Sequence, residues 1–519
     1  MLSKKRLICD AELKKGYNSN KNGQPGCNMD EESLQELVHD KLGDYLVIVV
    51  SNREPYIHNW EGEEIKCVQP ASGLAIALDP MLQACGGLWI AHGSGDADVD
   101  VVDENNKIQV PPEAPRYTLK RIWLSKSEEE SYYDGFSNKA LWPLCHTVYV
   151  RPEFNKSDWD TYQKVNKLFA QVVIEEIDER KAFVFIQDYH LALVAQYIKE
   201  QHPDVITAQF WHIPWPNSEA FRICPWRGEI LHGLLANDLL GFHTMYNCNN
   251  FLETVDRHLE CKIERERYAV IRGGHTTLVR PFPLGIAFDK ISARANSKHV
   301  TQQVEQLRHF YGLGTEFIGL GIDRVDYTKG IPERLRAVDR FLEEYPEYEE
   351  RLTFVQVGVP NRMRVEAYQR INDEIDELVD KINWRHGIGR WKPIVYINRY
   401  CLQDTLTALS RLADFCIVSS LQDGMNLVAK EFVASRTDRD GALILSQFTG
   451  AARELPEALL INPYCIEDTV ESIKQALEMP RVERHKRMSR MRKTVRSNNI
   501  YNWAASIITE LTKSEFFEA

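Results

Sequence analysis

The stretch Ser419-Ser-Leu-Gln-Asp-Gly-Met-Asn-Leu-Val-Ala-Lys-Glu431 follows the apolar run Phe415–Val418. Together they predict a buried strand, a polar turn and a helix that begins near Met425. The first turn of such a helix presents unpaired N–H groups and the positive end of the helix dipole, which suit a phosphate. Asp423 lies in the turn, and Glu431 follows two helical turns later, where a carboxylate can grip hydroxyls. The segment therefore predicts a site for a nucleotide-sugar.

The same alternation of strand and helix runs through most of the chain. Strands are predicted at 45–50, 88–91, 182–186, 205–211, 239–242, 317–322, 352–358, 394–398, 415–419 and 442–446, with helices between many of them. Repeated alternation of this kind indicates parallel sheets covered by helices on both faces. We therefore expect an α/β protein with two doubly wound, Rossmann-like domains that face each other across a cleft.

The domain boundaries follow from changes in composition. Residues 1–43 are polar and predict a flexible extension, within which a short helix around 31–40 stays open. Residues 44–290 predict an N-terminal Rossmann-like acceptor domain. Residues 291–480 predict a C-terminal Rossmann-like nucleotide-sugar domain. The basic residues 481–519 predict a helix that crosses back to the N-terminal domain.

Composition excludes several classes of protein. The 519 residues are 44% hydrophobic and carry a net charge of −12, which argues against general affinity for nucleic acid or for an anionic membrane. Eleven cysteines without a CxxC pair favour reduced thiols over disulfides or a zinc site. The sequence shows neither a signal peptide nor an apolar run long enough to span a bilayer. These observations predict a cytoplasmic protein.

Candidate site residues follow the predicted strands of the first half, where ligands bind in open parallel sheets. Arg53 can clamp a phosphate bidentately, and Ser72-Gly73 opens a helix where backbone can approach one. Asp188 can orient a hydroxyl, although taken alone it is more typical of a helix N-cap. His212 lies in the rigid aromatic segment Phe210–Pro216, suited to stacking on a sugar or to packing.

The second half adds basic residues. Arg324 and Lys329 flank one loop before a helix, as expected for neutralising a diphosphate leaving group, and Arg362 is a further candidate phosphate clamp. No GxxxxGK[ST] motif occurs, which counts against an ATPase. Asp96-Ala97-Asp98 lies in a loop rich in glycine and aspartate, so we interpret it as solvated and expect no metal.

Together these motifs resemble those of the trehalose-6-phosphate synthases, a family of retaining glycosyltransferases with the GT-B fold. The matching segments run in order from residue 45 to about residue 510. They are Ser51-Asn52-Arg53, Tyr132-Tyr133, Leu141-Trp142-Pro143, Asp188-Tyr189-His190, His212-Ile213-Pro214, Arg324 to Gly330, Asp423 to Glu431, Leu445 to Phe448 and Asn462-Pro463-Tyr464.

The resemblance implies glucose transfer from UDP-glucose to glucose 6-phosphate with retention, giving α,α-trehalose 6-phosphate and UDP without a metal or another cofactor. For the acceptor it implies binding by Arg53, Tyr133, Trp142, Asp188 and Arg362. For the donor it implies binding by Ser72, Gly73, Arg324, Lys329, Asp423, Asn426, Leu427, Val428, Ala429 and Glu431, with His212 beside the transferred glucose. Arg324, Lys329, His212 and Asp188 are the candidate catalytic residues.

Three segments depart from the family pattern: Ser72-Gly73, Glu54-Pro55-Tyr56 and the stretch from Ala91 to Asp98. They leave the donor nucleotide and the acceptor open. One alternative is a transferase of the same fold that uses another acceptor, such as glycerol 3-phosphate. The other is a sugar-phosphate sensor without activity, which would predict a degraded donor site. The oligomeric state, including a homo-oligomer, also stays open.

Overall fold

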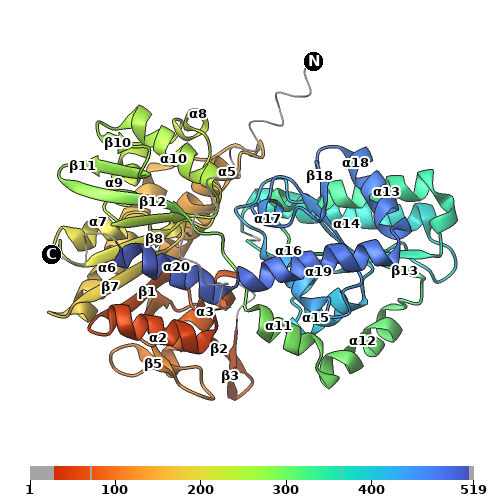
Figure 1. Cartoon of the computed structure of the whole chain (residues 1–519), viewed down its shortest axis with the longest axis horizontal. Coiled ribbons are helices and arrows are strands. Elements are labelled where there is room, and N and C mark those ends of the chain that lie inside the picture. The colour runs from red at the N-terminus through yellow and green to blue at the C-terminus, as the bar shows by residue number, and fades with distance from the viewer. Residues whose placement is uncertain (1–28, 70–72, 363, 514–519) are drawn as a thin grey trace.

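The computed structural model describes residues 29–69, 73–362 and 364–513. Figure 1 shows two α/β domains side by side, each built on one large sheet. The first sheet has the order β10 (Lys262–Glu264), β11 (Ala269–Arg272), β12 (His275–Pro281), β9 (Leu239–Phe242), β8 (Ile206–Phe210), β7 (Ala182–Gln187), β1 (Leu46–Arg53), β4 (Leu88–His92), β6 (Tyr117–Ile122) and β5 (Lys107–Val110). The second has the order β15 (Ile394–Ile397), β14 (Leu352–Val359), β13 (Phe317–Arg324), β16 (Phe415–Val418), β17 (Ala442–Ser446) and β18 (Leu459–Ile461).

The N-terminal sheet is parallel from β12 to β6, and antiparallel strands extend both edges. Its strands are apolar on both faces because helices cover both. In β1, Ile48 and Val50 pack into one core layer, whereas Val47 and Val49 pack into the other. The first layer is covered by η2 (Glu130–Leu141), α5 (Trp142–His146), α6 (Lys156–Ile177), α7 (Val194–Lys199), α9 (Arg227–Leu234) and α10 (Met245–His258), and the second by α2 (Glu31–Leu42), α3 (Gly73–Cys85) and α20 (Ile500–Thr512).

The C-terminal sheet is parallel throughout. Residues Leu320 and Val418 face one apolar layer, and Phe415 and Ile417 face the other. One layer is covered by α11 (Phe288–Ala295), α12 (Lys298–Tyr311), α15 (Gln403–Leu412), α16 (Leu427–Ser435) and α19 (Arg481–Ser497), and the other by α13 (Ile331–Glu344), α14 (Glu366–His386) and α18 (Ile466–Glu478). The expected pair of doubly wound sheets is confirmed.

Shorter elements complete the chain. Most of them connect strands with helices close to the ends of the two sheets. They are the hairpin β2 (Ile57–Glu61) and β3 (Glu64–Val68), the helices α4 (Lys126–Glu129), α8 (Ser218–Phe221) and α17 (Ala451–Glu454), and the 3₁₀ turns η1 (Asp98–Asp100), η3 (Tyr189–Leu191), η4 (Tyr327–Lys329) and η5 (Pro346–Tyr348).

The chain crosses between the domains at two places that touch each other. A Cβ atom on Gly285 would lie 2.2 Å from the carbonyl oxygen of Asn498, so only glycine fits this approach. The ammonium of Lys430, which is fully buried, donates to the carbonyl of Leu284 (2.7 Å) and to Glu454 (2.9 Å). Glu454 also accepts a hydrogen bond from the Asn498 side chain (3.1 Å). One buried ion pair therefore joins both crossings.

The two C-terminal helices divide between the domains. In Figure 1, α19 lies on the C-terminal domain and α20 lies on the N-terminal domain. Met488 and Met491 of α19 enter one core, and Trp503 and Ile507 of α20 enter the other. The return of the chain to the N-terminal domain thus falls on α20, whereas α19 stays with the C-terminal domain.

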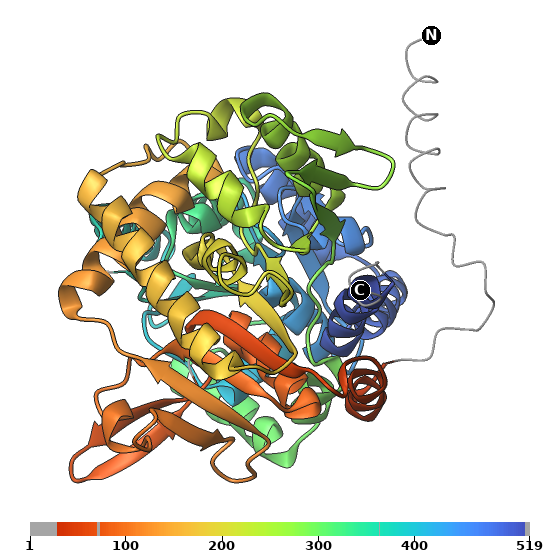
Figure 2. The ribbon, with the colours of Figure 1, turned by 90° about the vertical axis from the view of Figure 1, so that its left-hand side faces the viewer.

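The predicted flexible extension differs from the structure over its last part. Residues 1–28 lie outside the described residues, but Glu31–Leu42 forms α2. Leu34, Val38 and Leu42 are buried at a spacing of four residues, which places them on one face of the helix. Figure 2 shows α2 beside α20, and Tyr501 of α20 donates to Glu31 (3.3 Å). The structure therefore confirms the helix that the sequence left open around residues 31–40 and packs it against the N-terminal domain.

Removing one buried side chain of α2 tests whether this helix is part of the fold. Leu34 is fully buried against α3 and α20, so Leu34→Ala should lower the free energy of unfolding by about 2–5 kcal/mol. Chemical denaturation measures the loss. Gln35→Ala, on the exposed side of the same turn, is the matched control and should cost less than about 0.5 kcal/mol. Equal stability of the two variants would show that α2 contributes no packing.

Candidate functional site

A cleft with a volume of about 280 Å³ lies between the carboxyl ends of the two sheets. Most of the residues that the sequence singled out line it together. These are Arg53, Tyr133, Trp142, Asp188, His212, Arg324, Lys329, Arg362, Asp423, Asn426, Leu427, Val428 and Glu431. Ala429 is buried behind the lining, Gly73 begins α3, and Ser72 lies outside the described residues.

One end of the cleft holds a tyrosine between two guanidinium groups. Arg53, at the end of β1, donates to the hydroxyl of Tyr133 (2.7 Å), and the guanidinium carbon of Arg362 lies 5.8 Å from the ring centroid of Tyr133. Burial alone would raise the pKa of Tyr133, but Arg53 and Arg362 lower it to about 7. The two cations and the hydroxyl form a pocket suited to a phosphate.

Arg362 is held firmly from several sides. Its guanidinium lies 4.3 Å from the ring centroid of Trp142, donates to the hydroxyl of Tyr368 (2.5 Å) and lies 3.6 Å from Asp326. The backbone at Arg362 has φ = 48°, an uncommon conformation outside glycine. Because these contacts fix both backbone and side chain, the guanidinium is presented to the cleft in one orientation.

Asp188 lies in the middle of the cleft. Its φ of 70° and ψ of 175° fall in a region that is strained for any residue with a Cβ. The carboxylate caps no helix but accepts a hydrogen bond from the backbone N–H of His212 (3.1 Å), so the N-cap interpretation of Asp188 is wrong. Burial raises the pKa of Asp188 to about 7, against the opposing effect of the backbone N–H groups of Tyr189 and His212 and of Arg362.

His212 is enclosed by neighbours that the sequence did not single out. Its Nε2 atom lies 2.9 Å from Oε1 of Gln187, and its ring contacts the ring of His243 at a centroid distance of 5.6 Å. Burial lowers the pKa of His212 well below its ordinary value, which favours the neutral imidazole. With Nε2 donating its proton to Gln187, the Nδ1 atom of His212 is the acceptor.

The other end of the cleft contains the stretch Asp423–Glu431. Lys329 pairs with Asp423 (2.6 Å), which also accepts from the side chain of Asn426 (3.1 Å). Burial would raise the pKa of Asp423, but Lys329 and Asn426 hold it at about 2. Asn426 caps α16 by accepting from the N–H of Ala429 (3.1 Å), so that N–H is already satisfied.

Two further charges flank this end. Arg324 ends β13 and points to the cleft, and within the described residues it forms no ion pair. Burial raises the pKa of Glu431 to about 7, with Arg294 opposing the shift. The two domains approach closely here, because a Cβ atom on Gly424 would lie 2.2 Å from the carbonyl oxygen of His212.

Several polar atoms that line the cleft lack a hydrogen-bond partner within the part of the chain that is described. They are Oδ1 of Asn52, Nε1 of Trp142, Nε2 of Gln187, Nε2 of His190 and Nε of Arg362. Buried polar groups are normally paired, so a cluster of unpaired ones indicates a place where a polar ligand completes the bonds. Gln187 and His190 lie within two residues of Asp188 in the sequence. Their closeness to this candidate residue could have identified them as part of the site.

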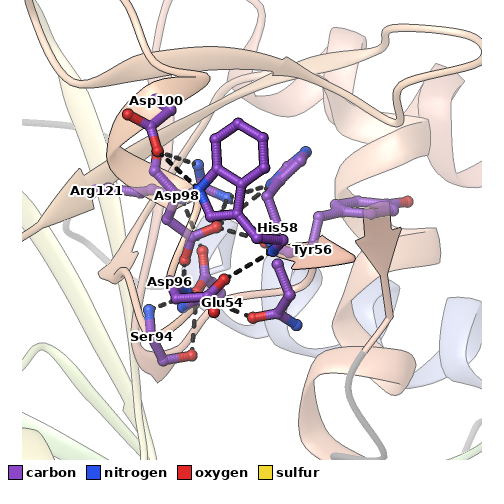
Figure 3. A network of polar contacts seen from close by, with 11 residues as sticks. Glu54, Tyr56, His58, Ser94, Asp96, Asp98, Asp100 and Arg121 are labelled. Carbon is purple, nitrogen blue, oxygen red and sulfur yellow. Dashed lines mark hydrogen bonds and ion pairs between the residues drawn. The ribbon is translucent and has the colours of Figure 1, made fainter. Parts of the chain in front are cut away.

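The interpretation of Asp96-Ala97-Asp98 as solvated is wrong for Asp98. Its side chain is fully buried and pairs with Arg121 (2.8 Å), as Figure 3 shows, while Asp96 accepts from the backbone N–H of Trp60 (2.8 Å). Among the described residues no group of three His, Cys, Asp or Glu side chains could hold a metal ion. Over the same residues, no helix combines the length and apolarity needed to cross a membrane.

Comparison with known proteins gives consistent results. The sequence model of Glycosyltransferase family 20 matches residues 45–513. The chain is 37% identical over 478 residues to the trehalose-6-phosphate synthase of Mycolicibacterium vanbaalenii, covering 90% of this chain and 96% of that one. It is also 37% identical over 480 residues to the bifunctional trehalose-6-phosphate synthase/phosphatase of Thermoproteus tenax, but spans only 64% of the length of that relative.

Solved structures agree in fold. An E. coli structure bound with UDP-2-fluoro glucose superposes with a TM-score of 0.80 at 30% identity, covering 90% of this chain and 99% of the other. The α,α-trehalose-phosphate synthase (UDP-forming) of Burkholderia xenovorans, in complex with glucose-6-phosphate, has the same TM-score, identity and coverage. The chain therefore belongs to glycosyltransferase family 20, the family of the trehalose-6-phosphate synthases, and has their GT-B fold of two Rossmann-like domains.

Proposed function

We propose that the protein transfers glucose from UDP-glucose to glucose 6-phosphate, forming α,α-trehalose 6-phosphate and UDP. The observation that carries the proposal is one cleft with a cationic pocket at each end. Arg53 and Arg362 form one pocket, and Arg324 and Lys329 form the other. Two phosphate-bearing substrates with their sugars directed inward fit this arrangement. The relatives with bound UDP-2-fluoro glucose and glucose-6-phosphate support the same pair of substrates.

At the acceptor end, Arg53, Tyr133 and Arg362 are proposed to bind the phosphate of glucose 6-phosphate. Asp188 and Trp142 are then positioned for the sugar ring, Asp188 through its carboxyl group and Trp142 through its unpaired Nε1 atom. At a pKa of about 7, Asp188 can accept or share a proton with a sugar hydroxyl at neutral pH.

At the donor end, Arg324 and Lys329 are proposed to stabilise the negative charge that develops on the departing UDP. The start of α16 supplies the N–H groups of Leu427 and Val428, and Glu431 is available for ribose hydroxyls. Asp423 is proposed to bind the donor glucose, and His212 lies beside it. Substrate positioning and electrostatic support account for catalysis by these residues.

Other properties follow the resemblance to the family and are part of the proposal. They are retention of configuration, through attack on the same face that UDP leaves, transfer without a metal ion, and a cytoplasmic location. A homo-oligomer remains open. The main competing function is transfer to another phosphorylated acceptor such as glycerol 3-phosphate. The polar and aromatic lining at Trp142, Gln187 and His190 favours an acceptor with many hydroxyls.

Identification of the product tests this function directly. Purified protein is offered UDP-, ADP- or GDP-glucose together with glucose 6-phosphate or glycerol 3-phosphate, and products are identified by mass spectrometry and NMR. We expect trehalose 6-phosphate and UDP from the first pair, with α configuration at both anomeric carbons. Product from glycerol 3-phosphate alone would identify the competing transferase. Substrate binding without product from any pair would indicate a sensor.

Removal of the Lys329 ammonium tests the proposed support of the leaving group. Lys329→Ala should raise the activation free energy of transfer by about 2–4 kcal/mol, because one preorganised donor is lost. The drop should appear mainly in kcat, since the charge on UDP grows in the transition state. Lys381→Ala, which changes an exposed lysine on α14, is the control and should leave kcat unchanged. A near-normal kcat for Lys329→Ala would refute this role.

The pKa of Asp188 predicts a conflict between stability and function. Its pKa rises from 3.8 in the unfolded chain to about 7 in the folded protein, so its ionisation destabilises the fold as pH rises through that range. Asp188→Asn should therefore raise Tm, relative to the wild type, more at pH 8 than at pH 5. Turnover should fall by about 100-fold or more.

The exposed Asp373→Asn is the control for both measurements, and we expect it to change neither Tm nor turnover. An equal difference in Tm between Asp188→Asn and the wild type at both pH values would contradict the assigned pKa. Unchanged turnover would contradict the assigned role.

A further inference from the structure

A buried ionic cluster lies just outside the cleft, behind Arg53. Figure 3 shows its members: Arg121 pairs with Glu54 (2.8 Å) and with Asp98 (2.8 Å), and all three side chains are fully buried. Arg121 also contacts Nδ1 of His58 (2.8 Å) and donates to the carbonyl of Tyr56 (3.0 Å). The Arg121 side chain thereby contacts four other residues in the N-terminal domain.

The cluster joins the carboxyl ends of three neighbouring strands. Glu54 follows β1 directly, and Arg121 lies near the end of β6. Between them, Ser94 follows β4 and donates to Glu54 through both its N–H (2.8 Å) and its hydroxyl (3.1 Å). Asp98, the first residue of η1, links this turn to the cluster and accepts a hydrogen bond from the N–H of His58 on β2 (2.8 Å). The cluster therefore fixes the rim of the sheet at this point.

Arg53 depends on the same stretch of backbone. The pairing of β1 with β4 shifts register between Ser51 and Arg53, an irregularity of the kind that redirects side chains. Neighbouring residues of extended chain point to opposite sides, so Arg53 faces the cleft while Glu54 faces Arg121. An anchored Glu54 thus restricts the position from which the Arg53 guanidinium reaches Tyr133.

Burying the charges of the cluster costs desolvation free energy, so stability alone does not explain why they are there. One arginine faces two carboxylates, and burial raises the pKa of Glu54 to about 8, while hydrogen bonds and Arg121 lower that of Asp98. A well-packed apolar core of the same volume is often as stable as a buried ion pair, so such pairs can serve to specify one conformation.

We propose that Glu54, Asp98 and Arg121 are positioning residues that hold Arg53 in its phosphate-binding orientation and so set the affinity for the acceptor phosphate. This inference rests on the proposed function, because it assigns the Arg53 pocket to the acceptor. It adds residues that touch no substrate and act through the backbone between β1 and β2. The expected signature is an effect on the acceptor that the donor does not share.

Glu54→Gln tests the proposal with little change of shape. The amide keeps the size of the side chain and, when KM is measured at about pH 9, where Glu54 is ionised, loses the charge paired with Arg121. We expect KM for glucose 6-phosphate to rise about tenfold, the loss expected for one charge-assisted bond, with KM for UDP-glucose and kcat within about twofold of the wild type. Thermal melting verifies folding. If Glu54→Gln does not fold, Glu54→Asp replaces it, since it keeps the charge but retracts the carboxylate from its partners.

The matched control is another buried carboxylate in the same domain. Asp238 pairs with Lys199 (2.9 Å) and accepts from the N–H of Thr207 (2.8 Å), at the amino ends of β8 and β9, away from the cleft. Asp238→Asn should lower Tm without changing either KM. A general loss of stability would affect both variants alike, so the contrast isolates positioning from stability.

A double-mutant cycle with Arg53→Ala decides whether Glu54 acts through Arg53. If it does, Glu54→Gln should change KM for glucose 6-phosphate by less than about twofold once Arg53 is absent. Fully additive effects, or equal rises in KM for donor and acceptor, would overturn the positioning role. A wild-type protein that makes no product from UDP-glucose and glucose 6-phosphate would instead refute the proposed function itself, before any variant is compared.

Discussion

The buried ammonium of Lys430 is the contact on which the rest of the structure depends. It belongs to α16, the helix that the Asp423–Glu431 stretch begins, and it binds the chain where the domains join, at Leu284 and through Glu454. The helix that lines this end of the cleft is therefore also held at the crossing between the domains. Because Gly285 lets both crossings touch, the two sheets turn their carboxyl ends toward each other at a fixed separation. The cleft exists because this joint is close-packed and charged.

Strain and unfavourable burial concentrate around that cleft. Asp188 combines a backbone conformation suited to glycine with a carboxyl group whose burial raises its pKa, and Arg362 combines positive φ with an unpaired Nε atom. Tyr133 is polarised by two arginines that repel each other. Such features lower stability and persist when neighbouring structure supports them. The helices behind them, with apolar faces packed on both sides of each sheet, supply that support.

Much of this architecture could be predicted from local pattern. Apolar runs such as Phe415–Val418 identified most of the parallel strands, although β6, β12 and β18 were missed. The residues after the identified strands came together at the cleft because carboxyl ends meet at one edge. Contacts between residues that are far apart in the sequence could not be predicted from local pattern. Asp98 looked solvated because its cation, Arg121, lies on a strand far away in the sequence. The apolar stripe of α2 gains its partners from α3 and α20, which a local pattern does not reveal. The exposed hairpin β2–β3 and the edge strands β10 and β11 were missed, since their alternation is weak and partly polar.

The ion pair between Lys329 and Asp423 affects which anions can bind at this end of the cleft. Lys329 has a counter-ion, Asp423, 2.6 Å away, which offsets much of its charge. A diphosphate that approaches must therefore exchange partners with Asp423, and that exchange is favourable only if the freed carboxylate gains hydroxyls to bind in return. Inorganic phosphate brings no sugar and leaves Asp423 uncompensated. Under the proposed assignment of this end to the donor, the pair favours ligands that carry a diphosphate and a sugar together.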